Sequence, residues 1–133
     1  MGKSRLVLFV VVCLGWVSLA ASSWATCLQS DIQGPWQSYS MSDVGVWSRC
    51  SLTINASGTV TSGKCVDSDG YPSTVLSGKV TLKNDCTASG NLKLSNGYII
   101  TIQHGTLGKD KSYFFGVGRD NHGSTYKLDA AKK

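Results

Sequence analysis

Histidine and aspartate side chains are the first residues to consider for chemistry, because imidazole binds metals and carboxylates bind calcium or transfer protons. The sequence has two histidines, His104 and His122, and neither has a cysteine or carboxylate at metal-ligand spacing. Asp67 and Asp69 resemble the start of a calcium loop, but the twelfth position of that loop is Gly78, where a glutamate is needed. We interpret both aspartates as turn formers and expect no metal and no cofactor.

Serine is abundant, but a nucleophilic serine needs a base and a fixed geometry around it. The sequence contains no G-x-S-x-G elbow, and all eight of its acidic residues are aspartates, most of them in predicted turns. A triad dispersed along the chain would leave no signature in a sequence. We therefore expect a protein that is not an enzyme.

The first 25 residues have the composition of a secretory signal peptide. Lys3 and Arg5 form a basic start, a long apolar run follows, and small residues flank the expected cleavage site. The apolar stretch over 6–21 is 16 residues long, shorter than the roughly 20 needed to span a bilayer. We expect cleavage after Ala25, one β domain over 26–133, no membrane span after signal removal, and a secreted or periplasmic location.

The charge of the chain is mildly basic. The sequence has 13 Lys and Arg against 8 Asp and Glu, and loss of Lys3 and Arg5 leaves 11 against 8, a net charge of +3. These basic residues are scattered along the chain, whereas a nucleic-acid binder carries them in a clustered stripe. We expect no nucleic-acid partner.

Cysteine spacing indicates two disulfides. Four cysteines remain after signal removal, and none has the C-x-x-C spacing of a redox or zinc motif. A hairpin turn at 57–58 places positions whose numbers add to 115 opposite each other, so that Cys50 faces Cys65 at a distance a disulfide can bridge. Of the three possible pairings we favour Cys50–Cys65, which leaves Cys27 to pair with Cys86.

Alternation of apolar and polar residues predicts strands throughout the chain after the signal, with no helical periodicity. In 74–83, for example, Leu76, Val80 and Leu82 are expected to face inward, and Asn96-Gly97 predicts a type I′ hairpin turn. The predicted strands cover 34–39, 46–55, 59–66, 74–83, 91–94, 98–104, 113–119 and 125–129.

Short turns between consecutive strands favour an up-and-down meander, and eight such strands can close and remove their edges. The predicted fold class is therefore all-β: a small antiparallel up-and-down meander barrel of about eight strands, stapled by two disulfides. A β-sandwich is the alternative.

Gly34-Pro35-Trp36, at the start of the first predicted strand, resembles the Gly-x-Trp of calycin-type barrels, the avidins and lipocalins. The resemblance implies a meander barrel in which Trp36 packs near the closed end. In lipocalins a basic residue near the last strand lies over this tryptophan, and Arg119 and Lys127 are the candidates here. The sequence has no convincing match to the biotin contacts of avidin, and it is short for a lipocalin.

Aromatic side chains are the main candidates for binding. His104 continues the face of Tyr98 and Ile102, which predicts that it points inward at one end of the barrel. We predict a non-catalytic binding protein that holds an unknown ligand, a small apolar or aromatic molecule, in the barrel mouth. The candidate contacts are Trp36, Tyr98, His104, Tyr113 and Phe115.

The alternative function is a structural or interaction protein with a filled core that binds a protein or glycan through its outer face. Trp47 shares an outward strand face with Arg49, a pair typical of interface hot spots. Trp47 could instead cover the barrel end or pack under the 67–72 loop. A barrel of eight strands can be filled by its own side chains, so an aromatic-lined cavity would separate the two functions.

Overall fold

The computed structural model describes residues 26–133, so the predicted signal peptide, 1–25, lies outside the described residues. A 3-10 helix, η1 (Gln29–Ile32), precedes eight strands. The strands are β1 (Gly34–Ser42), β2 (Trp47–Ile54), β3 (Val60–Asp67), β4 (Pro72–Leu82), β5 (Thr87–Leu94), β6 (Ile99–Leu107), β7 (Tyr113–Asp120) and β8 (Thr125–Lys132).

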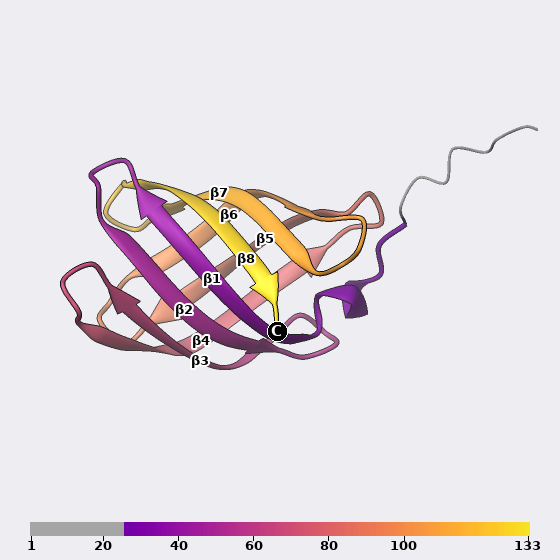
Figure 1. Ribbon diagram of the computed structural model, residues 1–133, viewed down its shortest axis with the longest axis horizontal. Helices are drawn as coiled ribbons and strands as arrows, with labels where there is room; N and C mark the ends of the chain where they lie inside the picture. Colours follow the sequence, from indigo (N-terminus) through magenta and orange to yellow (C-terminus); the bar gives the residue numbers. More distant parts are fainter. Residues whose placement is uncertain (1–25) are drawn as a thin grey trace, which may run out of the picture.

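The strands form a closed barrel in sequence order (Figure 1). Each strand pairs antiparallel with the next, and β8 returns to pair with β1. This confirms the meander barrel over the sandwich. Within residues 26–133, no helix has the length and apolarity to cross a membrane.

Several hairpin turns use one polar side chain in the same way. The side-chain oxygens of Asn55, Asp67 and Asp120 each accept hydrogen bonds from the backbone N–H groups two and four residues later. The prediction of a type I′ turn at Asn96-Gly97 is wrong, because only Gly97 has a positive φ and that turn needs two such residues.

The barrel core follows the predicted alternation along most strands. Inward side chains pack in one cluster that includes Leu52, Val80, Leu92 and Ile102. At about 25 cal/mol per Å² of apolar surface removed from water, this cluster is the main source of stability.

Two β-bulges shift the alternation and correct two predictions. A bulge between Val75 and Ser77 turns Val75 toward the core and leaves Leu76 60% exposed. A bulge between Ile102 and His104 turns Gly105 inward and leaves His104 exposed on the outer surface. The predicted inward positions of Leu76 and His104 are therefore wrong, because each bulge adds one residue and the alternation changes face across it.

Both predicted disulfides are confirmed. Cys50 lies opposite Cys65 in the β2–β3 ladder, with Cα atoms 4.0 Å apart. Cys27 is bonded to Cys86, at a Cα separation of 5.1 Å, and joins the segment before η1 to the start of β5.

The ladder between β3 and β4 is the shortest in the barrel. It spans three residue pairs near the β3–β4 turn, with one isolated bridge between Thr59 and Lys79 further along. Beyond these pairs the side chain of Gln29 takes the place of a strand. Its Nε2 donates to the carbonyl of Val80 at 3.0 Å, and its Oε1 accepts from the N–H of Leu82 at 2.9 Å.

Candidate functional site

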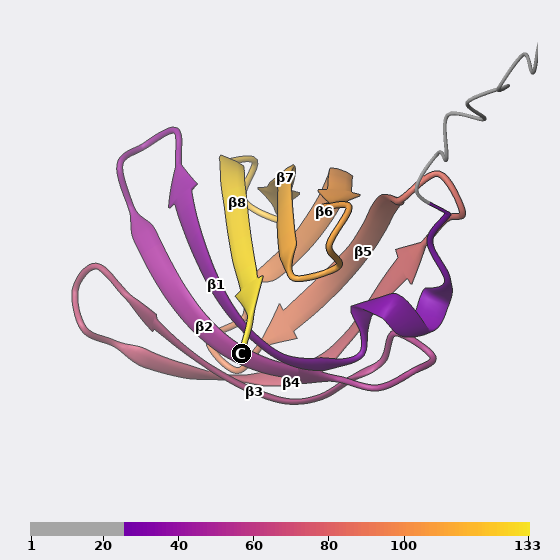
Figure 2. The same ribbon diagram turned by 45° about the vertical axis from the view of Figure 1, so that its right-hand side comes forward.

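One end of the barrel is closed by η1, as both ribbon views show (Figure 2). Trp36 is 2% exposed above this helix, and its indole N–H donates to the carbonyl of Ile32 at 2.8 Å. The Nζ of Lys132 lies 5.3 Å from the centre of the Trp36 ring and donates to the carbonyl of Asp31. The basic partner of Trp36 is therefore Lys132, whereas Arg119 and Lys127 are exposed on the outer face.

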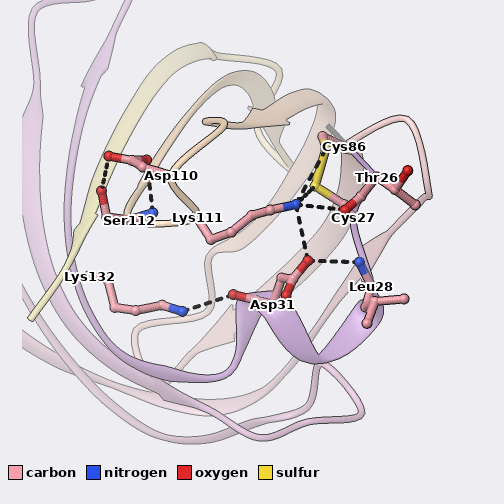
Figure 3. A network of polar contacts seen from close by, with 9 residues as sticks. All are labelled: Thr26, Cys27, Leu28, Asp31, Cys86, Asp110, Lys111, Ser112 and Lys132. Atoms are coloured by element: carbon pink, nitrogen blue, oxygen red, sulfur yellow. Dashed lines mark hydrogen bonds and ion pairs between the residues drawn. A yellow bond between two sulfur atoms is a disulfide. The ribbon is translucent and has the colours of Figure 1, made fainter. Parts of the chain in front are cut away.

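A polar network fixes the segment before η1 to the rest of the closed end (Figure 3). Lys111 forms an ion pair with Asp31 at 3.1 Å and contacts the carbonyl of Thr26 and the sulfur of Cys27. The backbone N–H of Leu28 and the Lys111 ammonium both lower the pKa of Asp31. The closed end is thus held by a disulfide, an ion pair and several hydrogen bonds.

The interior above Trp36 contains a small apolar cavity. Its volume is about 50 Å³, and its lining includes Trp36, Leu52 and Phe114. Sites for drug-sized ligands usually have volumes of about 300–1,000 Å³. Trp36 therefore belongs to a nearly filled core at the closed end, away from the mouth.

A second pocket opens at the other end, the mouth, between the turns at 43–46, 68–71, 95–98 and 121–124. Its volume is about 120 Å³. Tyr98 lies at its edge and is 38% exposed, and Leu94 and Ile100 line it from inside the barrel. Of the five predicted ligand contacts, Tyr98 is the one that the structure places in this pocket, which we call the mouth pocket.

The mouth half of the barrel holds all the buried polar side chains of the described residues. These are Ser40, Ser42, Ser73 and Asp120, each no more than 8% exposed. The hydroxyl oxygens of Ser40 and Ser48 lie 2.6 Å apart, and the hydroxyl of Ser42 accepts from the N–H of Val46. The buried polar side chains of the described residues are therefore gathered toward the mouth, beside apolar residues such as Leu94 and Ile100.

Asp120 is the charged member of this group. Its Oδ1 accepts the N–H groups of His122 and Ser124, and its Oδ2 accepts the hydroxyl of Tyr126 at 3.0 Å. Burial acts to raise the pKa of Asp120, but the bonds from Tyr126, Ser124 and His122 outweigh it and hold that pKa below its usual value. Burial and the bond to Asp120 raise the pKa of Tyr126 to about 12.

The other predicted contacts lie on the outside of the barrel. Tyr113 is 43% exposed and Phe115 is 49% exposed, with their ring centres 6.4 Å apart, while Phe114 between them points inward. The hydroxyl of Tyr113 donates to Asp129 at 2.5 Å. His104, also outside, lies opposite Val117 on the neighbouring strand.

These side chains form part of a larger exposed surface on β1, β2, β7 and β8, the strands nearest the viewer in Figure 1. Met41 lies opposite Trp47, and Tyr39 lies opposite Arg49 on one side and Asp129 on the other. We call this surface the aromatic face; its exposed apolar members are Tyr39, Met41, Trp47, Tyr113, Phe115 and Val117.

The opposite side of the barrel has a different composition. Apart from Leu76, the exposed outward residues of β3, β4 and β5 are mostly serine, threonine, asparagine and lysine. Ser62, Lys79 and Asn91 are examples. The exposed aromatic side chains of the strands are therefore concentrated on one side of the barrel.

Four residues that line the mouth pocket or hold the closed end were not predicted as such from the sequence: Asp120, Tyr126, Lys132 and Gln29. Asp120 begins an Asp-Asn-His-Gly sequence, which predicts an exposed turn and gives no indication that the Asp120 side chain is buried. The alternation Tyr126–Leu128 did identify one face of β8, and its extension to position 132 would have reached Lys132. Gln29 carries no sequence signal, because its partners are backbone groups about fifty residues away.

Among residues 26–133, no group of three or more His, Cys, Asp or Glu side chains is arranged to hold a metal ion.

Comparison with known proteins identifies the fold and no family. No protein-family model matches the chain, and no curated protein does. A redesigned β-barrel, mFAP1, solved bound to DFHBI, is similar with a TM-score of 0.66 and 21% identity, over 84% of this chain and 100% of that one. A fluorescence-activating β-barrel designed de novo has a TM-score of 0.62 and 17% identity, over 76% of this chain and 93% of that one. At these identities the chain shares the closed meander-barrel fold with the designed proteins.

Proposed function

We propose that this protein is an exported, non-catalytic interaction protein that binds a protein or glycan through the aromatic face. The observation that carries the proposal is the one-sided distribution of exposed aromatic side chains on the outer strands. Interface cores are enriched in Trp, Tyr, Phe, Met and Arg. The aromatic face contains the first four of these residue types, and Arg49, which lies opposite Tyr39, adds the fifth.

Two further features support the proposal. The cavity above Trp36 is too small for an aromatic ligand, as expected of a barrel whose core is filled by its own side chains. The two disulfides fit an oxidising compartment, which agrees with the predicted signal peptide.

Site-specific photo-crosslinking would test this function. A photoreactive phenylalanine analogue at position 47 or 115 should give adducts in the exported fraction of the producing cells. The same analogue at position 76, which is also exposed but lies on the polar side, is the matched control. Adducts at 47 and 115 that disappear with Tyr39→Ser support the proposal. Equal labelling at all three positions, or none at any, contradicts it.

A second candidate is the binding of a small molecule in the mouth. The mouth pocket, with Tyr98 at its edge, favours it, and the similar designed barrel mFAP1 was solved bound to DFHBI. The position of Lys132 over Trp36 also agrees with the calycin resemblance of Gly34-Pro35-Trp36. Native mass spectrometry of the gently purified protein would show extra mass that denaturation removes; a bare mass would oppose this candidate.

A further inference from the structure

We propose that the mouth pocket binds a small organic ammonium ion. This inference rests on the second candidate function and names the chemical class of its ligand. It differs from the apolar or aromatic ligand expected from the sequence, because the pocket is lined by a buried carboxylate and hydroxyl groups.

Buried polar side chains are unevenly distributed along the barrel interior. A buried polar group stabilises a fold only when it is hydrogen-bonded, and an apolar side chain of similar size usually serves a core as well. The four buried polar side chains of residues 26–133, Ser40, Ser42, Ser73 and Asp120, all lie in the mouth half, and Ser73 and Asp120 line the mouth pocket itself. A few polar groups placed in a largely apolar pocket are typical of a site that orients a ligand.

Asp120 places a buried carboxylate beside the mouth pocket. Its carboxylate is 6% exposed and has three hydrogen bonds, but no lysine or arginine of residues 26–133 forms an ion pair with it. The ion pair found in that part of the chain, Lys111–Asp31, lies at the opposite end. The hydrogen bonds of Asp120 and the neighbouring His122 already favour its ionised form, and a bound cation would add an ionic partner to this buried charge.

Asp120 also has the capacity for one more contact. An ionised carboxylate has about four acceptor positions. Two are used on Oδ1 by the backbone N–H groups of His122 and Ser124, and one on Oδ2 by Tyr126. The remaining position on Oδ2 is available to a donor in the pocket that Asp120 lines.

The mouth pocket also has an aromatic lining. Tyr98 and Tyr126 both line the mouth pocket, and the faces of tyrosine rings attract ammonium groups. His122 packs edge-on against Tyr98, with ring centres 4.8 Å apart, and restricts the position of that ring. Leu94 and Ile100 line the pocket from inside, where the alkyl groups of an organic ammonium would pack. The volume of about 120 Å³ limits the ligand to a small one.

The surrounding turns agree with this sign of charge. Two of the four mouth turns contain one aspartate each, Asp43 in 43–46 and Asp69 in 68–71. None of the four, including 95–98 and 121–124, contains lysine or arginine, although the chain as a whole is basic. His122 is the titratable base among them. A cation would therefore be attracted toward the mouth.

The test is a titration followed by amide NMR shifts. The probes are choline and propylammonium, and their uncharged counterparts are 3,3-dimethyl-1-butanol and 1-propanol. We expect at least one ammonium ion to give saturable shifts at Ser124, Tyr126 and Tyr98, and the alcohols to bind at least tenfold more weakly. Asp120→Asn, which keeps the Oδ1 acceptor, should weaken binding of the ammonium ion at least tenfold. Asp85→Asn, the same charge change in a turn at the closed end, should bind as the wild type does.

Several results would overturn the inference. Absence of saturable shifts with both ammonium ions would do so, as would equal binding of the alcohols or ammonium shifts centred on Trp47 and Phe115. Alcohols that bind in the mouth when the ammonium ions do not would preserve the second candidate function and remove this inference alone. If Asp120→Asn does not fold, the comparison of charged and uncharged probes on the wild type still decides the question.

Discussion

The side-chain ammonium of Lys132 lies over the indole of Trp36 and donates to the carbonyl of Asp31, so one cation joins the last strand, the first strand and η1. Lys132→Met keeps the aliphatic stem and removes the charge. We expect a loss of about 1–2 kcal/mol in the free energy of unfolding, since a partly buried cation–π contact and a hydrogen bond are both lost.

Urea denaturation monitored by tryptophan fluorescence would measure this loss. Lys133→Met, an exposed neighbour, is the control and should change stability by less than about 0.5 kcal/mol. Equal effects of the two substitutions would show that the contact with Trp36 contributes nothing.

The two disulfides close loops of different length, and we expect their removal to have different costs. Cys50–Cys65 spans 15 residues and Cys27–Cys86 spans 59. If a disulfide acts by restricting the unfolded chain, the paired serine variants should lose about 3 and about 4 kcal/mol respectively. Chemical denaturation of each double variant gives both values. A larger loss from Cys50–Cys65 would contradict the chain-entropy explanation.

The bulge in β6 predicts that alanine substitutions at two neighbouring residues have different effects on stability. Gly105 faces the core, where an added Cβ would lie 2.3 Å from the ring of Phe114, so Gly105→Ala should destabilise the barrel by about 1–3 kcal/mol. His104→Ala on the outer surface should change stability by no more than about 0.5 kcal/mol. Thermal unfolding of the two variants measures both effects. A larger loss of stability from His104→Ala than from Gly105→Ala would indicate that His104 points inward.

Tyr126 should limit stability in alkaline solution. Burial and its hydrogen bond to Asp120 raise its pKa to about 12, above the usual value of 10.0. Since the folded pKa is the higher one, this contribution to stability is complete below pH 10 and is lost as pH rises from 10 toward 12. Urea unfolding across that range should show a steeper decline for the wild type than for Tyr126→Phe. Parallel declines would contradict the assignment.

The sequence predicted the barrel well because its information is local. Alternating residues such as Leu52 and Ile54 identify the inward face, and short turns place each strand beside the next. The Cys50–Cys65 pairing followed from the register of a single hairpin. These features need no knowledge of distant parts of the chain.

The site was harder to predict because it depends on which residues of each strand face inward and on contacts between distant parts of the chain. One extra residue in β6 turned His104 from the inside of the barrel to the outer face, and the alternation before it gives no warning of the change. Tyr113 and Phe115 were correctly placed on one strand face, but alternation alone does not say whether that face is inside. The partner of Trp36 came from the very end of the chain, beyond the last predicted strand at 125–129.

The contact of Gln29 with β4 has a consequence for self-association. The β3–β4 ladder spans three residue pairs and one isolated bridge, and beyond them this side chain covers the carbonyl of Val80 and the N–H of Leu82. If the segment before η1 is displaced, for example by reduction of Cys27–Cys86, these backbone groups become a template for a strand of another molecule. The disulfide and Gln29 therefore protect the protein from domain exchange and aggregation as well as from unfolding.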